Sequence, residues 1–237
     1  GVQTCALPIS DHLPVNSLVI FNNPRVINAR IIFKKPTGGR IEIFCLEPIR
    51  QISKKGESTW HCLVGGAAKW KEGSLSTTCH IKGKAVQLFA ACMKRDGEIF
   101  TIRFSWDPEL NFDEVIAAAG ILPLPPYLKR ESEPGDDERY QTIYASESGS
   151  VAAPTAGLHF TDAVMHDLGV KNIKTGFVTL HVSAGTFKPV EAATMEGHKM
   201  HAEWIDVNKD LIRQIAQQKD PIVAVGTTSI RTLETLY

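Results

Sequence analysis

The hydrophobic pattern of this chain changes near residue 107, and this change restricts the possible folds most. Between residues 30 and 106 the chain has short β-branched and aromatic runs separated by Gly-containing turns. In the last run every second residue is large and apolar: Phe100, Ile102, Phe104 and Trp106. A period of two is typical of strands with one buried face. We therefore predict a small β-barrel or sandwich over residues 30–106.

Beyond residue 107 the pattern becomes one of alternating helices and strands. Asn111 and Glu114 have the spacing of a capping box, which predicts a short helix ending at Gly120. Further on, the pattern predicts helices over 162–168 and 208–218, strands over 172–182 and 221–225, and a helix from Thr227. Such alternation is typical of an α/β arrangement.

The predicted fold class is therefore mixed α/β, with a catalytic domain that carries an inserted β-barrel domain. The catalytic domain is expected to comprise residues 11–29 and 107–237, and the insert residues 30–106. Residues 1–10 fit neither pattern, and we treat them as a foreign tail. An apolar run begins at Leu18 and resumes at Val26 after a turn, which predicts strand, turn, strand.

Composition excludes several classes of protein. The chain has 237 residues, enough for a sizeable core, and 26 basic residues balance 26 acidic residues. It has no apolar run of the roughly 18 residues that a membrane helix needs and no secretory signal, so we expect a cytoplasmic protein without a membrane partner. Its five cysteines are odd in number and widely spaced, which argues against a disulfide framework and a zinc cluster.

Positive charge is concentrated in one part of the chain. Residues 25–84 contain twelve Lys or Arg and four Glu, which favours a surface that faces a polyanion such as RNA. Trp60 and Trp70 lie among these cations and have the side chains needed to stack on bases. A solvated lysine-rich face with core tryptophans is the alternative interpretation.

The segment 140–161 holds the densest set of chemically active residues. Gly157 has no side chain and Pro154 fixes the local backbone, so the chain can press its amides against a ligand. Thr161 is a suitable N-cap for the helix over 162–168, with Gly169 as its end. His159 then lies just before a helix N-terminus, placed to act as a base. An ordinary Ala-rich connector is the alternative.

Two later segments also place polar residues where strands end. His181 and Thr186 lie at the carboxyl end of the predicted strand 172–182, at the edge where open α/β sheets bind ligands. Gly226, Thr227, Thr228 and Ser229 follow the strand 221–225, and Arg231 lies one turn along. Amides, hydroxyls and a guanidinium suit a phosphate or carboxylate, although an ordinary capped helix explains the same residues.

His198, His201 and Glu203 form an H-x-x-H-x-E pattern. This spacing does not put all three side chains on one helical face, and no further metal ligands are evident. We therefore prefer acid-base or hydrogen-bonding roles and predict no metal. A pair of surface histidines is the alternative.

Several segments together resemble one enzyme family, the S-adenosylmethionine:tRNA ribosyltransferase-isomerases of queuosine biosynthesis. The segments are Asn22-Asn23, Gly120 with 123–127, Tyr140-Gln141, 152–161, 179–189, 198–203 and 225–229. Two residues depart from the family pattern, because Pro24 and Asn28 stand where Thr and Pro are expected. Family members are longer at both ends, so the resemblance implies that this chain is truncated.

The resemblance implies transfer and isomerisation of the ribosyl unit of S-adenosylmethionine onto 7-aminomethyl-7-deazaguanine at the tRNA wobble position, giving epoxyqueuosine, adenine and methionine. S-adenosylmethionine is a consumed substrate, and no cofactor is implied. The expected partners are tRNA and S-adenosylmethionine. We carry proton transfer over to His159, Glu203 and His201. We carry substrate binding over to Tyr140, Gln141, Thr155, Gly157, His181, Thr186, Thr227, Thr228 and Arg231.

Two other classes of function remain open at this point. The basic segment and the truncation favour a noncatalytic tRNA-binding fragment, against which the acidic α/β part argues. A nucleoside hydrolase or phosphorylase that uses the Gly-Thr-Thr-Ser segment would release adenine without tRNA.

Overall fold

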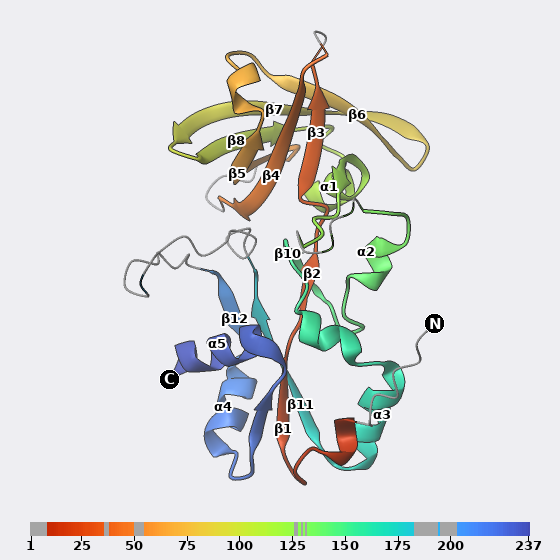
Figure 1. Ribbon diagram of the computed structural model, residues 1–237, viewed down its shortest axis with the longest axis vertical. Helices are drawn as coiled ribbons and strands as arrows, with labels where there is room; N and C mark the ends of the chain where they lie inside the picture. The colour runs from red at the N-terminus through yellow and green to blue at the C-terminus, as the bar shows by residue number, and fades with distance from the viewer. Residues whose placement is uncertain are drawn as a thin grey trace.

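A computed structural model shows two large sheets joined by a short ribbon of two strands (Figure 1). It describes residues 9–35, 38–49, 55–125, 128, 130, 132–182, 194 and 203–237. The predicted mixed α/β fold class is confirmed. Among the described residues, no helix is both long enough and apolar enough to cross a lipid bilayer.

The first sheet has four strands in the order β12-β11-β1-β13. These are β12 (Ile205–Val207), β11 (Lys174–Leu180), β1 (Leu18–Asn22) and β13 (Ile222–Ala224). The central strand β1 is parallel to both β11 and β13, and all five of its residues are buried. A parallel strand covered on both faces is expected to be continuously apolar, as β1 is from Leu18 to Phe21.

Helices cover both faces of this sheet. On one face, α3 (Asp162–Val170) packs its Leu168 against Val19 and Phe21 of β1. On the other, Leu211 of α4 (Lys209–Gln217) packs against Leu18 and Ile20, and α5 (Gly226–Leu236) lies beside it. Because successive strand residues point to opposite faces, one short strand holds both layers together.

The predicted helix over 162–168, with Gly169 as its end, is two residues too short. The helix continues to Val170, and the residue in the left-handed conformation is Asn172, at φ 54°. The Ile173 amide donates to the Leu168 carbonyl at 2.9 Å and so closes the helix end. Asn tolerates positive φ better than most residues, so glycine is not needed here.

The second sheet has seven strands in the order β6-β7-β8-β5-β4-β3-β9, and every pair is antiparallel. The strands are β3 (Arg30–Lys34), β4 (Arg40–Pro48), β5 (Glu57–Gly65), β6 (Leu75–Ile81), β7 (Lys84–Asp96), β8 (Ile99–Ser105) and β9 (Gly120–Ile121). The sheet curls into a half-barrel, and a short turn η2 (Ala67–Lys69) follows β5.

Helix α1 (Phe112–Ala119) packs its buried Val115 and Ile116 into the core of the half-barrel. The predicted capping box is present, since the Glu114 amide donates to Asn111 and the Asn111 amide to Glu114. Trp60 is only 5% exposed and lies 5.3 Å from the Phe112 ring. Its proposed role in stacking on bases is therefore wrong, because the strand pattern turns it into the core.

The ribbon between the sheets consists of β2 (Pro24–Val26) and β10 (Glu147–Ser150), which are parallel. The single strand predicted to resume at Val26 is thus two strands, β2 and β3, in different sheets. The boundaries proposed for the insert remain a proposal, and one strand of the half-barrel, β9, follows residue 106. The remaining short elements are η1 (Ile9–Asp11), α2 (Asp136–Arg139) and η4 (Thr155–His159).

Candidate functional site

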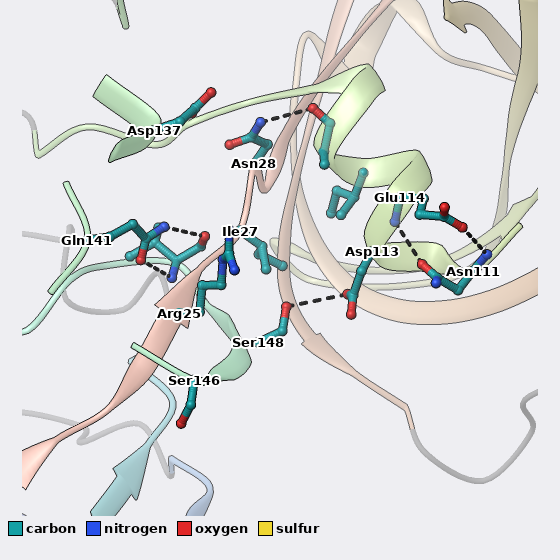
Figure 2. Close-up of a pocket in the computed structure, with 13 residues that line it drawn as sticks. Arg25, Ile27, Asn28, Asn111, Asp113, Glu114, Asp137, Gln141, Ser146 and Ser148 are labelled. Atoms are coloured by element: carbon teal, nitrogen blue, oxygen red, sulfur yellow. Dashed lines mark hydrogen bonds between the residues drawn. The ribbon is translucent and has the colours of Figure 1, made fainter. Parts of the chain in front are cut away.

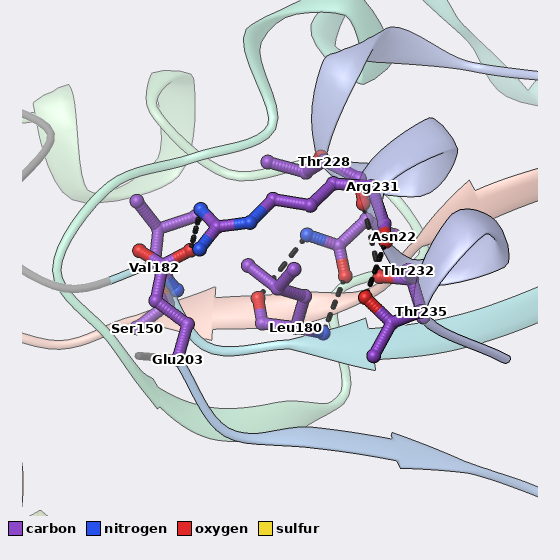
Figure 3. Close-up of polar contacts among 9 residues, drawn as sticks. All are labelled: Asn22, Ser150, Leu180, Val182, Glu203, Thr228, Arg231, Thr232 and Thr235. Carbon is purple, nitrogen blue, oxygen red and sulfur yellow. Dashed lines mark hydrogen bonds and ion pairs between the residues drawn. The ribbon is translucent and has the colours of Figure 1, made fainter. Parts of the chain in front are cut away.

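The parallel strands β1, β11 and β13 end at the same edge of the four-stranded sheet. Open α/β sheets bind ligands at this edge. Asn22, the last residue of β1, is buried and fastens the edge (Figure 3). Its Nδ2 donates to the Leu180 carbonyl at 3.2 Å, and the Leu180 amide donates to its Oδ1 at 2.8 Å. The ends of β1 and β11 are therefore held in fixed register.

Asn23 continues this network toward the ribbon. The Thr179 hydroxyl donates to Asn23 Oδ1 at 2.7 Å, and Asn23 Nδ2 donates to the Ser146 hydroxyl at 2.9 Å. The Ser150 hydroxyl accepts from the Val182 amide at 3.2 Å. Short polar side chains thus connect the sheet edge to the segment before and within β10.

The start of α5 lies beside the segment 152–161. Gly226 has φ +82°, and a Cβ there would lie 3.2 Å from the Ala156 Cβ, so a larger residue is strained in two ways. The N-cap residue Val225 provides no side-chain cap to the first amides of α5. Thr227 is exposed and Thr228 half-buried at this end. Uncapped amides and hydroxyls are the features that predicted an anion site here.

Arg231 and Glu203 form an ion pair at this edge. Arg231 Nη1 lies 2.5 Å from Glu203 Oε2, and the Glu203 side chain is 5% exposed (Figure 3). The structure therefore joins a residue predicted to bind an anion with a residue predicted to transfer a proton. Arg231 and Glu203 are 28 residues apart in sequence, and they meet because α5 and the segment before β12 come together on the sheet.

The segment 152–161 presents a histidine to solvent. His159 is the last residue of η4 and is exposed, as is Thr155 at the first position. Thr161 caps α3 as predicted, with its hydroxyl accepting from the Val164 amide at 3.3 Å. The side chain of His159 is thus accessible, on an element whose Ala156 lies against Gly226 at the start of α5.

Gly157 lies against a buried tyrosine. A Cβ at Gly157 would overlap the Tyr144 hydroxyl and lie 2.9 Å from Thr142 Cγ2. Within the described part of the chain, the buried hydroxyls of Tyr144 and Thr142 have no hydrogen-bond partner. Burial raises the pKa of the Tyr144 hydroxyl above its ordinary value. The space beside Gly157 is therefore filled by this chain's own tyrosine.

Three other predicted site residues contact the chain itself. Tyr140 is 8% exposed and packs with Val26, while Gln141 exchanges two hydrogen bonds with the Val26 backbone, at 3.0 and 2.8 Å. The His181 ring lies 5.2 Å from the Trp204 ring, at 31°. His201 and Thr186 lie outside the described residues. In the described ranges, no three His, Cys, Asp or Glu side chains are close enough to hold a metal.

A pocket of about 600 Å³ lies between α1, α2, β2 and β10 (Figure 2). Its lining includes Arg25, Asp113, Asp137, Gln141 and Ser148. The sequence identified only Gln141 among these as a site residue. Arg25 lies two residues after the Asn22-Asn23 segment that resembles the family, and this proximity could have identified it. Asp113 and Asp137 lie on helices far from that segment in sequence, and no sequence pattern marks them as site residues.

A sequence model of the family described as "Queuosine biosynthesis protein" matches residues 5–237. The match begins within the segment 1–10 that we treated as foreign. A crystal structure of an S-adenosylmethionine tRNA ribosyltransferase from Thermotoga maritima is similar in sequence at 26% identity. That match covers 96% of this chain and 57% of the other, with a TM-score of 0.33. The chain thus spans little more than half the length of that protein.

Proposed function

The chain belongs to the queuosine biosynthesis protein family, and on this premise we propose that it is an S-adenosylmethionine:tRNA ribosyltransferase-isomerase. The observation that carries the proposal is the family match from residue 5 to 237, which includes every motif at the sheet edge. The proposed substrates are S-adenosylmethionine and tRNA with 7-aminomethyl-7-deazaguanine at the wobble position. The products are epoxyqueuosine in tRNA, adenine and methionine.

The chemistry needs two kinds of proton transfer. The sulfonium acidifies the adjoining ribose CH₂, so a positioned base favours the first step, and departing adenine needs a proton donor. We assign these roles to His159 and Glu203, with His201 as a further candidate. His159 is exposed at the end of η4, and Arg231 holds Glu203 in position through their ion pair.

The substrate contacts follow the same edge. Thr155, Gly157 and Thr186 are proposed to shape the S-adenosylmethionine pocket, with Tyr140, Gln141 and His181 supporting the bound base. Thr227 and Thr228, with the first amides of α5, are proposed to hold a carboxylate or an RNA phosphate. Arg231 contributes from one turn along while its ion pair with Glu203 fixes its side chain. S-adenosylmethionine acts as a consumed substrate, and the proposal requires no metal or further cofactor.

Chromatographic measurement of adenine tests this proposal. The chain is incubated with S-adenosylmethionine, either alone or with tRNA that carries the aminomethyl-deazaguanine or with unmodified tRNA. Adenine that forms only with the modified tRNA supports the ribosyltransferase. Adenine that forms without tRNA would favour a nucleoside hydrolase. Binding of tRNA with no adenine would leave a noncatalytic RNA-binding fragment.

A further inference from the structure

We propose that the pocket between α1, α2, β2 and β10 binds the methionyl end of S-adenosylmethionine. In this arrangement Arg25 binds the α-carboxylate, which leaves the start of α5 for an RNA phosphate. Asp113 and Asp137 face the α-ammonium and the sulfonium. The inference rests on the proposed function, because it assigns a location to one end of the proposed substrate.

The side chains of Arg25, Asp113 and Asp137 form no ion pairs with the residues that the structure describes. Within the described part of the chain, the side chains of Arg25 and Asp137 have no hydrogen-bond or ion-pair partner. Asp113 accepts only a long hydrogen bond, 3.4 Å, from the Ser148 hydroxyl. Glu114 in the same lining differs, because it binds Lys82 at 2.8 Å and completes the capping box of α1. The pocket therefore retains one guanidinium and two carboxylates for a ligand.

The ribbon keeps Arg25 and Asp113 apart. Arg25 on β2 is opposite Ser148 on β10, and Ser148 is the residue that contacts Asp113 (Figure 2). Arg25 and Asp113 line one pocket without forming an ion pair. Opposite charges that share a pocket but do not meet leave room for a ligand that bridges them.

An ion pair of the preceding residue anchors the backbone at Asp137. Its neighbour Asp136 is buried and accepts two hydrogen bonds from Arg130, at 2.6 and 2.9 Å, and one from the Glu133 amide at 2.9 Å. These contacts fix the short helix α2 against the preceding loop. Asp137 therefore lines the pocket from an anchored backbone.

The charges of the pocket are opposite in sign to those of the proposed ligand. S-adenosylmethionine carries two cations, the sulfonium and the α-ammonium, and one α-carboxylate. Arginine binds carboxylates through two parallel hydrogen bonds, which gives direction as well as affinity. The aminomethyl-deazaguanine base carries one cation and no carboxylate, so it leaves Arg25 without a partner. A volume of about 600 Å³ falls within the usual range for small-molecule sites.

Two residues that line the pocket also contact the sheet edge and the segment 152–161. Ser146 lines it and accepts the hydrogen bond from Asn23. Val26 lines it as well and packs against Ala153, at the start of the segment 152–161. With the amino-acid end near Arg25, the proposal places the adenosyl end on the side of that segment.

Titration calorimetry without tRNA tests the assignment. The unaltered chain, Arg25→Ala, Arg25→Lys and Asp113→Asn/Asp137→Asn are titrated with S-adenosylmethionine and with 5′-methylthioadenosine, which lacks the amino-acid end and the sulfonium. We expect the Kd for S-adenosylmethionine to rise about tenfold or more in Arg25→Ala and in the double variant, and less in Arg25→Lys. The Kd for 5′-methylthioadenosine should not change. Arg103→Ala, an exposed arginine of β8, is the matched control.

Three results would overturn the assignment. One is an Arg25→Ala Kd for S-adenosylmethionine equal to that of Arg103→Ala. Another is equal weakening of S-adenosylmethionine and 5′-methylthioadenosine, which would put the contact outside the amino-acid end. The third is failure of the unaltered chain to bind S-adenosylmethionine. Failure of the proposed function looks different, because S-adenosylmethionine then binds but modified tRNA yields no adenine.

Discussion

The half-barrel differs from the sheet edge and its pocket in whether polar and charged groups have partners within the protein. In the half-barrel, Phe33, Ile43 and Phe104 are fully buried, and charged residues pair locally, as Arg30 does with Glu42 at 2.8 Å. Around the edge and the pocket, the buried hydroxyls of Thr142 and Tyr144 have no hydrogen-bond partner in the described residues, and Arg25 forms no ion pair with Asp113 or Asp137. The half-barrel is built for stability, whereas the edge and pocket keep polar groups available for a ligand.

The largest expected effect comes from cutting into the half-barrel core. Phe104→Ala should lower the free energy of unfolding by about 3–5 kcal/mol, because it leaves a cavity in a fully buried position. Urea denaturation measures the change. Phe89→Ala, on the neighbouring strand and 42% exposed, is the matched control and should change stability by about 0.5 kcal/mol or less. Equal losses of unfolding free energy in both variants would contradict the claim that the half-barrel core is the main source of stability.

A smaller loss is expected beside the sheet edge. Gly157→Ala should destabilise the chain by about 1–3 kcal/mol, because its Cβ overlaps the Tyr144 hydroxyl. Adding Tyr144→Phe removes that hydroxyl and should restore part of the loss, although the ring carbon Cζ still lies 3.1 Å from the new Cβ. A double-mutant cycle in urea measures the coupling. Strictly additive changes in the free energy of unfolding would show that the two residues do not meet.

The ion pair between Arg130 and Asp136 predicts a change in stability that is confined to acid pH. The Arg130 guanidinium and the Glu133 amide hold the pKa of the Asp136 carboxyl well below its usual range. A lowered folded-state pKa stabilises the fold above about pH 4, and this stabilisation is lost as pH falls further. Asp136→Asn should therefore flatten the pH dependence of unfolding below about pH 4, as followed by circular dichroism. An unchanged acid profile would contradict the pairing.

The smallest effect is expected from one buried hydroxyl. Tyr144→Phe should raise the free energy of unfolding by about 1 kcal/mol, because the buried hydroxyl has no partner among the described residues. Burial raises the pKa of this group, so its contribution is constant below about pH 10 and the fold loses stability above that pH. The variant should lose part of that alkaline sensitivity in thermal melts. Destabilisation by the change would reveal a partner for the hydroxyl.

The sequence predicted local features well and long-range meetings poorly. The capping box of α1 and the Thr161 cap of α3 depend on residues three apart, so the pattern alone identifies them. The pairing of Arg231 with Glu203 depends on how α5 crosses the sheet, which no local pattern encodes. The pocket likewise assembles β2, α1 and α2 from distant parts of the chain.

The first apolar segment shows why a periodic pattern can still mislead. Val26 and Ile31 both read as strand residues, but β2 pairs with β10 in the ribbon while β3 pairs with β4 in the half-barrel. The chain changes sheets between them, where Asn28 Nδ2 donates to the Ala117 carbonyl at 3.1 Å. Strand propensity reports an extended backbone and not the partner strand.

Adenine release by His159→Ala tests the central claim, that the sheet edge carries the chemistry while the rest of the fold supports it. Because His159 is exposed, the account predicts an unfolding free energy within about 0.5 kcal/mol of the unaltered chain. It also predicts at least a roughly 100-fold slower release of adenine with modified tRNA. His166→Ala, an exposed histidine of α3, should keep both properties. Adenine release by His159→Ala at the rate of the His166→Ala control would contradict the account.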